Sequence, residues 1–456
     1  MTTYYVGPGG NDANDGLSWS ARKLTLNGAE DVPVAAGDTV YVAPGVYREL
    51  LTVDVSGEAG AIITYIGDVT GEHTDGVGGI VRITGSDNDL AAARNNCILI
   101  SSKNYRTFRG FTMDTVAQYP FVMASCTYII VEFCSIYGNL KGITSTGAGQ
   151  SNITIRNCML MGSSSYAIEL SHSADTSNCA ELVENCLIVA TIKGIFTTNL
   201  GGVTIKNNTF VGCNIGVEQY SAPAAGQTIV IYNNIFYCCT NRAIEVSTAG
   251  FTSEDYNTFY TCANAIGADC ASGGHSLTAP PLFEAPMLSD GVIYPWNPFA
   301  LSKWSTIKGI AGTGEPADDM FGVTRTTVAA KKSWGAVQYA PGIRSTTQAH
   351  LGSVSIKLPD AGAHQIFVPH DGAPVSVSVY AYMEADHAGT QPQMIIKQPG
   401  SADSTTTSTG DAATWALLSA AFTPAAKPDY FVIELRSLNT AVAGDYGVYF
   451  DDLKVE

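Results

Sequence analysis

Charged residues are scarce in this sequence, and those present are mostly acidic. Asp, Glu, Lys and Arg make up 14% of the 456 residues, with 41 acidic and 24 basic side chains and a formal net charge of −17. This balance argues against nonspecific binding to nucleic acid or to an anionic membrane. No run of about 18 apolar residues occurs, so we expect no membrane span. The first residues, MTTYYVGPGG, have neither a basic leader nor an apolar core, and we expect no secretory signal.

Several catalytic and metal-binding motifs are also absent. The sequence contains no H-x-x-x-H, C-x-x-C or G-x-S-x-G motif and no phosphate-binding glycine loop. Metalloproteases, esterases and nucleotide-dependent enzymes of the usual kinds are therefore excluded. The eleven cysteines are an odd number, and several recur at a regular spacing that indicates buried, reduced thiols rather than disulfides or zinc ligands. We expect folding in a reducing cytoplasm and no required cofactor.

A short motif is repeated along the chain. The segment VTIKNNTFVG at residues 203–212 returns as IVIYNNIFYC at residues 229–238. Aligned copies place a cysteine or asparagine at steps of 22 to 28 residues, at Cys134, Cys158, Cys186, Asn208, Asn234 and Asn257. A second motif follows each copy, for example KGIF at residues 193–196 and RAIEV at residues 242–246. Two linked series of this period, rich in Ile, Val, Thr and Phe, predict an all-β solenoid of short stacked strands.

The N-terminal region predicts a cap over the first coil, in residues 1–50, because the open end of a solenoid must be covered. Its segments YYVGPGGNDANDG and GDTVYVAPGVYRE, together with the NNTF and GI motifs, resemble the right-handed parallel β-helix superfamily of pectate-lyase-like proteins. Residues 282–340 resemble the segment that closes many such helices, although SWGA at residues 333–336 replaces a more usual acidic residue before the glycine.

That resemblance covers about three quarters of the chain. It implies a right-handed single-stranded parallel β-helix with coils over residues 51–276 and a closing segment over residues 277–340. It does not imply one activity, because the superfamily includes lyases, hydrolases, epimerases and adhesins.

The C-terminal part has a different pattern. PGIRSTT at residues 341–347 predicts a linker, and alternating segments such as VSVSVYAYM and YFVIELRSL predict an antiparallel β-sandwich over residues 348–456. The closing YFDDLKVE resembles the last strand of jelly-roll carbohydrate-binding modules. This resemblance implies a sugar-binding jelly roll and allows a structural calcium at Asp451 or Asp452. A solvated strand end is the alternative interpretation of both aspartates.

Alternation of side chains along each strand predicts which residues of the coils face outward. One outward row then contains Thr144, Glu169, Phe196, Glu218, Glu245 and Gly267, and a second contains Thr146, Ser171, Thr198, Tyr220 and Ser247. At about 4.8 Å per coil, Glu218 and Glu245 lie close to the separation of about 5 Å that retaining glycosidases use. Glu169 and Glu218 lie about 9.6 Å apart, at the upper limit for inverting enzymes. These three carboxylates are the candidate catalytic residues, and Phe196 and Tyr220 are candidate faces for a sugar ring.

Each of these residues also has a plainer interpretation. An exposed strand needs polar side chains, so a glutamate near Lys193 or Arg242 is often only solvated. Lys141, Lys193 and Arg242 share one position of the coil, where a lyase base is conceivable, but the acidic calcium cluster followed by a lysine of related alginate and chondroitin lyases is absent. His172 with Asp175 is a candidate proton shuttle or an ordinary surface histidine.

A long β-helix, a sandwich similar to sugar-binding modules, and reduced cysteines without a leader are combined in bacteriophage tailspikes and tail fibres, which this architecture resembles. The resemblance implies a homotrimer in a virion tail, bound to other tail proteins, that folds in the host cytoplasm and cleaves a bacterial surface polysaccharide. Its substrate contacts are predicted to be Phe196, Tyr220, His172, Lys193 and Arg242. A non-catalytic adhesin or virion decoration protein and a secreted bacterial polysaccharide lyase are the alternatives.

Overall fold

The computed structural model describes residues 1–281 apart from residues 32–33, 77, 139, 173–178, 199–200, 222–227 and 251, together with residues 320, 344–345, 355–358, 363–369, 374–383, 389–397, 404–408, 410, 413–423, 430–439 and 448–455. The chain divides into two compact units, residues 1–281 with 305–338 and residues 282–304 with 339–456. Most of the predicted closing segment (277–340) and linker (341–347) lies outside the described residues. No helix among the described residues is long and apolar enough to cross a bilayer.

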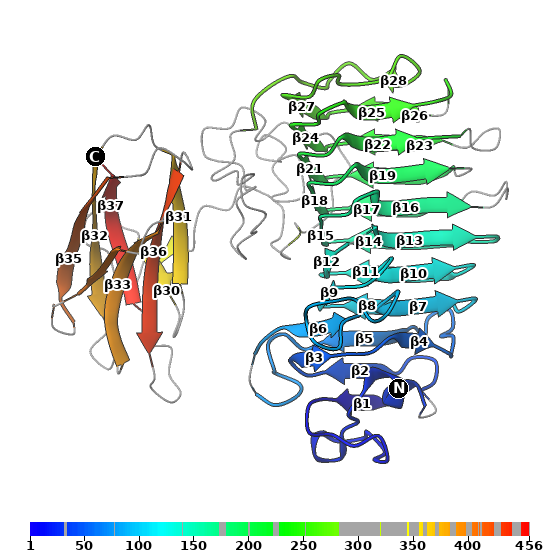
Figure 1. The fold of residues 1–456 in the computed structure, drawn as a ribbon, viewed down its shortest axis with the longest axis horizontal. Coiled ribbons are helices and arrows are strands. Elements are labelled where there is room, and N and C mark those ends of the chain that lie inside the picture. Colours follow the sequence, from blue (N-terminus) through cyan, green and yellow to red (C-terminus); the bar gives the residue numbers. More distant parts are fainter. Residues whose placement is uncertain are drawn as a thin grey trace. The chain divides into compact units, whose positions relative to one another are not determined.

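The first unit is a parallel β-helix built from three sheets, and its coils stack one above another (Figure 1). Sheet A has eleven strands: β1 (Thr3–Val6), β2 (Thr39–Val42), β5 (Ile63–Gly67), β8 (Arg106–Arg109), β11 (Thr127–Glu132), β14 (Ser151–Arg156), β17 (Glu181–Glu184), β20 (Val203–Lys206), β23 (Ile229–Tyr232), β26 (Thr252–Asp255) and β28 (Ala271–Ser272). Sheet B has nine: β3 (Gly45–Tyr47), β6 (Val81–Thr84), β9 (Phe111–Asp114), β12 (Ser135–Tyr137), β15 (Met159–Met161), β18 (Leu187–Val189), β21 (Thr209–Val211), β24 (Ile235–Tyr237) and β27 (Thr258–Tyr260).

Sheet C completes each coil with eight strands: β4 (Leu51–Val53), β7 (Ile98–Ser101), β10 (Phe121–Ala124), β13 (Lys141–Gly147), β16 (Tyr166–His172), β19 (Lys193–Thr198), β22 (Ile215–Gln219) and β25 (Arg242–Val246). Successive strands of one sheet come from successive coils, as the repeat predicted. Alternate residues of each strand are buried in one continuous apolar core that runs along the helix. This packing fixes the register of the coils, because a slip by one residue would turn the apolar face outward.

The repeated asparagines form a ladder inside the helix. Asn207 and Asn233 adopt left-handed backbone conformations, with φ of 53° and 58°, which asparagine tolerates better than most residues. The next residue in each coil, Asn208 or Asn234, is fully buried. Asn208 Nδ2 donates to Asn234 Oδ1 over 3.1 Å, and Asn234 Nδ2 donates to Asn257 Oδ1 over 3.0 Å. The N-N pair therefore makes a sharp corner and then satisfies buried polar groups from coil to coil.

Cysteines continue this ladder toward the N-terminus. Cys134, Cys158 and Cys186 are buried, and each thiol lies within hydrogen-bonding distance of backbone carbonyl oxygens. None of the eleven cysteines is joined in a disulfide in the structure.

The position before the isoleucine in the GI and AI motifs must hold a small residue for a steric reason. A Cβ atom on Gly194 would lie 2.8 Å from the Phe210 ring, and one on Gly216 would lie 2.6 Å from the Phe236 ring. These two rings stack inside the helix with centroids 4.6 Å apart. Two inward positions in succession, such as Gly194 and Ile195, make the residues on either side of them point outward together.

A short cap closes the N-terminal end. It contains a 3-10 turn at Trp19–Ala21 and the helix α1 at Leu26–Glu30, the helices found among the described residues. Glu30 of this helix is buried and forms an ion pair with the fully buried Arg106, with 2.9 Å between Oε1 and Nη1. Arg106 also donates to the carbonyl oxygen of Val55 over 2.8 Å. The buried ion pair thus links the N-terminal cap to the coils that follow it in the chain.

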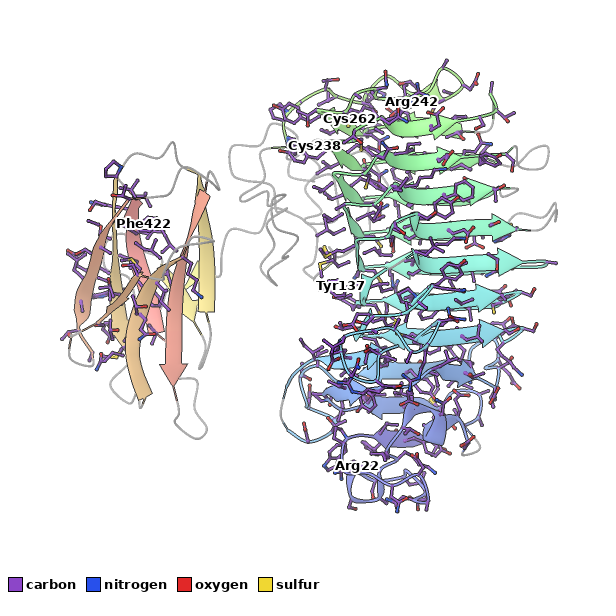
Figure 2. All side chains as sticks on the ribbon, in the orientation of Figure 1. Arg22, Tyr137, Cys238, Arg242, Cys262 and Phe422 are labelled. Carbon is purple, nitrogen blue, oxygen red and sulfur yellow. The ribbon has the colours of Figure 1, made fainter. Side chains whose placement is uncertain are left out.

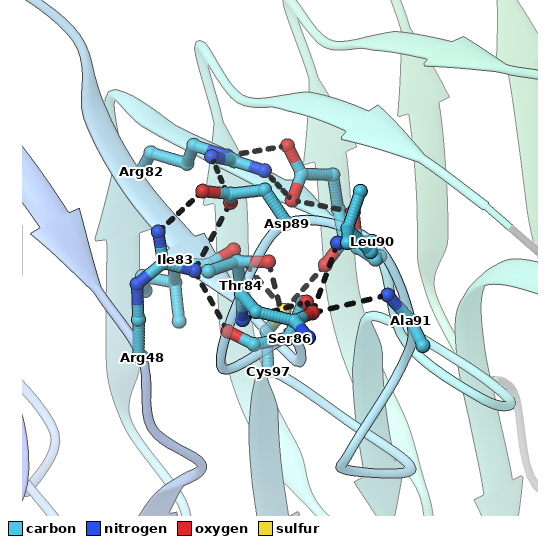
Figure 3. Close-up of polar contacts among 12 residues, drawn as sticks. Arg48, Arg82, Ile83, Thr84, Ser86, Asp89, Leu90, Ala91 and Cys97 are labelled. Carbon is cyan, nitrogen blue, oxygen red and sulfur yellow. Dashed lines mark hydrogen bonds and ion pairs between the residues drawn. The ribbon is translucent and has the colours of Figure 1, made fainter.

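The loop between β6 and β7 is held against the outside of the helix by arginines (Figure 3). Arg48 and Arg82 both contact the carboxylate of Asp89, and Arg82 also forms a two-pronged contact with Asp114 through distances of 2.7 and 2.9 Å. Asp89 has a left-handed backbone conformation, with φ of 63°. These hydrogen bonds hold the pKa of Asp89 at about 2.

The second unit is an antiparallel sandwich. One sheet has the order β29 (Arg344–Ser345), β30 (Ser355–Leu358), β37 (Val448–Val455), β32 (Val375–Met383) and β35 (Trp415–Phe422). The other has the order β31 (Ala363–Pro369), β36 (Tyr430–Asn439), β33 (Gly389–Lys397) and β34 (Ser404–Thr407). Residues of both sheets, including Val377, Ile396, Leu435 and Phe450, share one apolar core. An all-β chain with a parallel β-helix followed by a β-sandwich is therefore confirmed. Asp451 and Asp452 lie in β37, and a calcium site there stays a prediction.

Candidate functional site

The predicted carboxylates lie on one outward row of sheet C. Thr144 pairs with Glu169, Glu169 with Phe196, Phe196 with Glu218, and Glu218 with Glu245, on strands β13 to β25 in order. The preceding inward residues, such as Ile168, Val217 and Ile244, belong to the buried core. Glu218 and Glu245 are therefore direct neighbours on one face, and Glu169 lies two strands from Glu218.

A cation accompanies each carboxylate on this face. Lys141 Nζ lies 2.6 Å from Glu169 Oε2 on the next coil, and Lys193 contacts Glu218 on the next coil in the same way. Arg242 instead contacts Glu245 within its own strand. The row therefore carries three acidic and three basic groups in contact, so its charge is balanced. Each cation is followed by two residues that face inward and then by a residue of the outward row. The cation and the carboxylates of that row therefore lie on the same outer face.

Aromatic rings fill the spaces between these ion pairs. Tyr166 and Phe196 stack with centroids 4.4 Å apart and planes inclined by 6°, and Tyr220 lies 5.8 Å beyond Phe196. Lys193 Nζ lies over both Tyr166 and Phe196, at 5.3 and 5.1 Å from their centroids. Phe196 is only 7% exposed, whereas Tyr220 is 61% exposed. The structure thus places Phe196 within the stack and leaves Tyr220 as the accessible ring.

His172 does not lie on this face. It is the last residue of β16, is 2% exposed, and points toward the interior. Its Nδ1 atom lies 3.3 Å from the thiol of Cys179, and its Nε2 atom lies 3.4 Å from Glu181 Oε1. Burial raises the pKa of Glu181 well above its usual value. The predicted substrate contact of His172 is therefore wrong, because its strand position turns it inward. Asp175, its suggested partner, lies outside the described residues.

A charged ladder on the outer face of sheet A was not predicted. Glu132 accepts from Arg109 over 2.8 Å and from Arg156 over 2.7 Å. Lys206 Nζ lies 3.2 Å from Glu184 Oε2. These residues occupy the last strand position in successive coils, at the same offset before the Cys/Asn ladder, and that spacing was visible in the sequence. Ion pairs thus link neighbouring coils on sheet A as well as on sheet C.

Comparison with known proteins gives one family match. Residues 57–271, less than half of the chain, match the family described as periplasmic copper-binding protein (NosD). The chain is similar to that family over most of its coils. The match covers less than half of the chain, so the copper binding named in the family's description is said of that family alone. Within the described residues, no group of three or more His, Cys, Asp or Glu side chains is arranged to hold a metal ion.

Solved structures of similar fold include carbohydrate-active enzymes. A rhamnogalacturonan lyase is 15% identical, covers 57% of this chain and 74% of its own, and has a TM-score of 0.45. The pectate lyase Pel9A is 16% identical, with coverage of 75% and 97% and a TM-score of 0.40. The lacto-N-biosidase of family GH136 from Eubacterium ramulus is 12% identical, with coverage of 60% and 68% and a TM-score of 0.42. These similarities concern the fold alone. A search of curated proteins found no match.

Proposed function

We propose that this protein binds a bacterial surface polysaccharide along the outer face of sheet C and hydrolyses its glycosidic bonds. The observation that carries the proposal is the pairing of Glu218 with Glu245 on adjacent strands of that face. Adjacent strands are about 4.8 Å apart, close to the carboxylate separation of about 5–5.5 Å in retaining glycosidases. One carboxyl group would protonate the glycosidic oxygen while the other attacks the anomeric carbon, and water would then release the sugar with retained configuration.

The rest of the row suits a polymer that runs along the helix axis. Tyr220 offers an exposed ring beside Glu218, and the contacts of Lys193 and Arg242 fix the positions of the two carboxylates. Glu169 is two strands from Glu218, which offers a second pair near the upper end of the inverting range of about 6.5–9.5 Å. The stereochemistry of the product distinguishes these pairs.

The wider role that we propose is that of a tailspike or tail fibre, with a homotrimer in the virion tail. The support is architectural: a long β-helix is joined in one chain to a sandwich, and cysteines that form no disulfide suit folding in a reducing compartment. The order β30-β37-β32-β35 opposite β31-β36-β33-β34 supports the assignment of this sandwich as a jelly roll. We propose that it binds carbohydrate.

A non-catalytic adhesin is the second candidate, and the ion pairs favour it. Glu169, Glu218 and Glu245 each contact a cation, and such pairs also serve a purely structural face. A polysaccharide lyase would need Lys141, Lys193 or Arg242 as its base, and each of these would first have to leave its carboxylate.

The type of product separates these candidates. The full chain is incubated with a panel of capsular and exopolysaccharides, and we expect one of them to gain reducing ends. New ultraviolet-absorbing unsaturated ends would instead establish a lyase. Saturable binding with neither product would establish the adhesin.

A further inference from the structure

A cavity of about 500 Å³ opens on the outer face of sheet A at the C-terminal end of the β-helix. It is lined by residues of β23, β26 and β28, among them Tyr232, Ser253 and Asp255, and by Tyr256 and Gly273, which directly follow β26 and β28. Its volume is within the range of about 300–1,000 Å³ that small-ligand sites occupy. It lies on a different sheet from the carboxylates of the proposed polysaccharide site.

His275 lies next to the lining of this cavity, in contact with two of the lining residues, Asp255 and Tyr256. His275 Nδ1 lies 2.9 Å from Asp255 Oδ2, and the His275 backbone N–H donates to Asp255 Oδ1 over 3.0 Å. The His275 ring stacks on Tyr256, with centroids 4.5 Å apart and planes inclined by 3°. Burial raises the pKa of Asp255, but hydrogen bonds from His275 and Tyr256 outweigh it and lower that pKa overall. Asp255 holds the imidazole at Nδ1 and Tyr256 covers one face of the ring, and the Nε2 atom has no hydrogen bond within the described residues.

Gly273 is required for this arrangement. A Cβ atom at this position would lie 2.2 Å from Asp255 Cγ and 2.3 Å from Oδ2, so any side chain here would displace the Asp255 carboxylate. The absence of a side chain therefore lets the backbone pass directly against the carboxylate that orients His275.

The charges of the cavity restrict its ligand. Neither lysine nor arginine lines it, and the nearby Lys206 contacts Glu184. Glu254 is buried and accepts hydrogen bonds from Asn257, Ser272 and Ser276. An anionic ligand such as a uronate would meet the Asp255 carboxylate and no compensating cation among the described lining residues. A neutral ligand with hydroxyl groups would find an imidazole nitrogen, the Ser253 hydroxyl and aromatic rings, which together suit a sugar.

We propose that this cavity is a second carbohydrate site, which takes one residue of a neutral sugar and hydrogen-bonds a sugar hydroxyl through His275 Nε2. The proposal is independent of the Glu218 and Glu245 pair, and it holds whether or not the protein cleaves its ligand.

Ring signals of histidine in nuclear magnetic resonance spectra test it directly, because the chain has only seven histidines and His275→Ala identifies the relevant signal. The full chain is titrated with maltotriose, cellotriose, mannotriose and trigalacturonate. We expect a neutral trisaccharide to shift the His275 signals saturably. His275→Ala should weaken its binding, measured by calorimetry, by about tenfold, as loss of one hydrogen bond to the ligand predicts. Gly273→Ala should have the same effect.

His73 provides the matched control. It is an exposed residue of the loop after β5, stacks on Tyr41 of sheet A with centroids 4.2 Å apart, and donates its backbone N–H to Asp68, and neither of these partners lines the cavity. His73→Ala should leave the affinity unchanged. The proposal is overturned if no neutral trisaccharide shifts the His275 signals, if trigalacturonate binds there more tightly, or if Gly273→Ala binds as the wild type does.

Discussion

Glu218 lies directly beside Glu245 on neighbouring strands of sheet C, and both point out of the β-helix. Their positions differ by 27 in the sequence, from 218 to 245, so only stacking of coils in register brings them together. Their inward neighbours, Val217 and Ile244, are buried in the core and hold this register. The pair is the centre of the proposed polysaccharide site, and each member also contacts a cation.

The asparagine ladder should be essential to stability. Asn234→Ala removes the acceptor of both the side chain and the backbone N–H of Asn208, at 3.1 and 2.8 Å. Two buried donors then lose their partner, and we expect the free energy of unfolding to fall by about 2–5 kcal/mol. Urea denaturation measures this change. Asn264→Ala, which removes one exposed hydrogen bond to Asn241, is the control and should change stability by less than about 1 kcal/mol.

The buried ion pair of the cap gives a second stability prediction. Arg106→Ala leaves the buried Glu30 carboxylate without its cation, and we expect a loss of about 3–5 kcal/mol in the free energy of unfolding. Arg109→Ala removes a partly exposed arginine from the last position of the same strand, with an expected cost below about 1 kcal/mol. Equal losses in the two variants would contradict the structural role of the buried pair.

Thiol reactivity should follow the pKa values of the cysteines. Burial raises the pKa of Cys97 to about 12, whereas a hydrogen bond from Cys239 lowers the pKa of the half-buried Cys262. Figure 2 shows Cys262 near the C-terminal end of the β-helix. Because the thiolate is the reactive form, at about pH 8 iodoacetamide should modify Cys262 early and Cys97 only after unfolding. Peptide mass spectrometry over a time course checks this, and early labelling of Cys97 would contradict it.

Tyr220 should contribute to glycan affinity. It is the accessible ring of the aromatic stack, so Tyr220→Ala should weaken binding of the responsive polysaccharide by about five- to tenfold. Tyr128→Ala is the control. It removes a ring of β11 in sheet A that is 43% exposed and stacks on Tyr105, and it should leave binding unchanged. Affinity electrophoresis with the polysaccharide in the gel compares the two variants.

The repeat was sufficient to predict the fold and the register of the outward row. Regular spacing of Asn208, Asn234 and Asn257 reflects one structural requirement, a tight corner followed by a buried amide, and each coil must meet it in the same way. Glu218 and Glu245 are held in register by that same stacking, so their adjacency followed from the spacing alone.

Other contacts of the site could not be predicted from the simple alternation of inward and outward residues along a strand. Gly194 and Ile195 both face inward, so Lys193 lies on the same face as Glu218 and pairs with it. The stacking of Phe196 on Tyr166 also depends on side-chain packing rather than on position in the row. Asp255 belongs to the repeat, two residues before Asn257, but His275 follows the last copy of the motif, where no periodic signal remained to align it with Asp255.

Turnover by matched glutamine variants tests the central claim most directly. Glu218→Gln and Glu245→Gln are compared with Glu184→Gln, whose carboxylate also pairs with a lysine of a neighbouring coil. The side chains of Glu184 and Lys206 are 9% and 17% exposed, and those of Glu218 and Lys193 are 10% and 22% exposed. We predict that the rate at which reducing ends are released falls by about a hundred- to ten-thousandfold in Glu218→Gln and in Glu245→Gln. In Glu184→Gln this rate should equal that of the wild type. Unchanged turnover in both Glu218→Gln and Glu245→Gln would contradict the assignment of the catalytic pair.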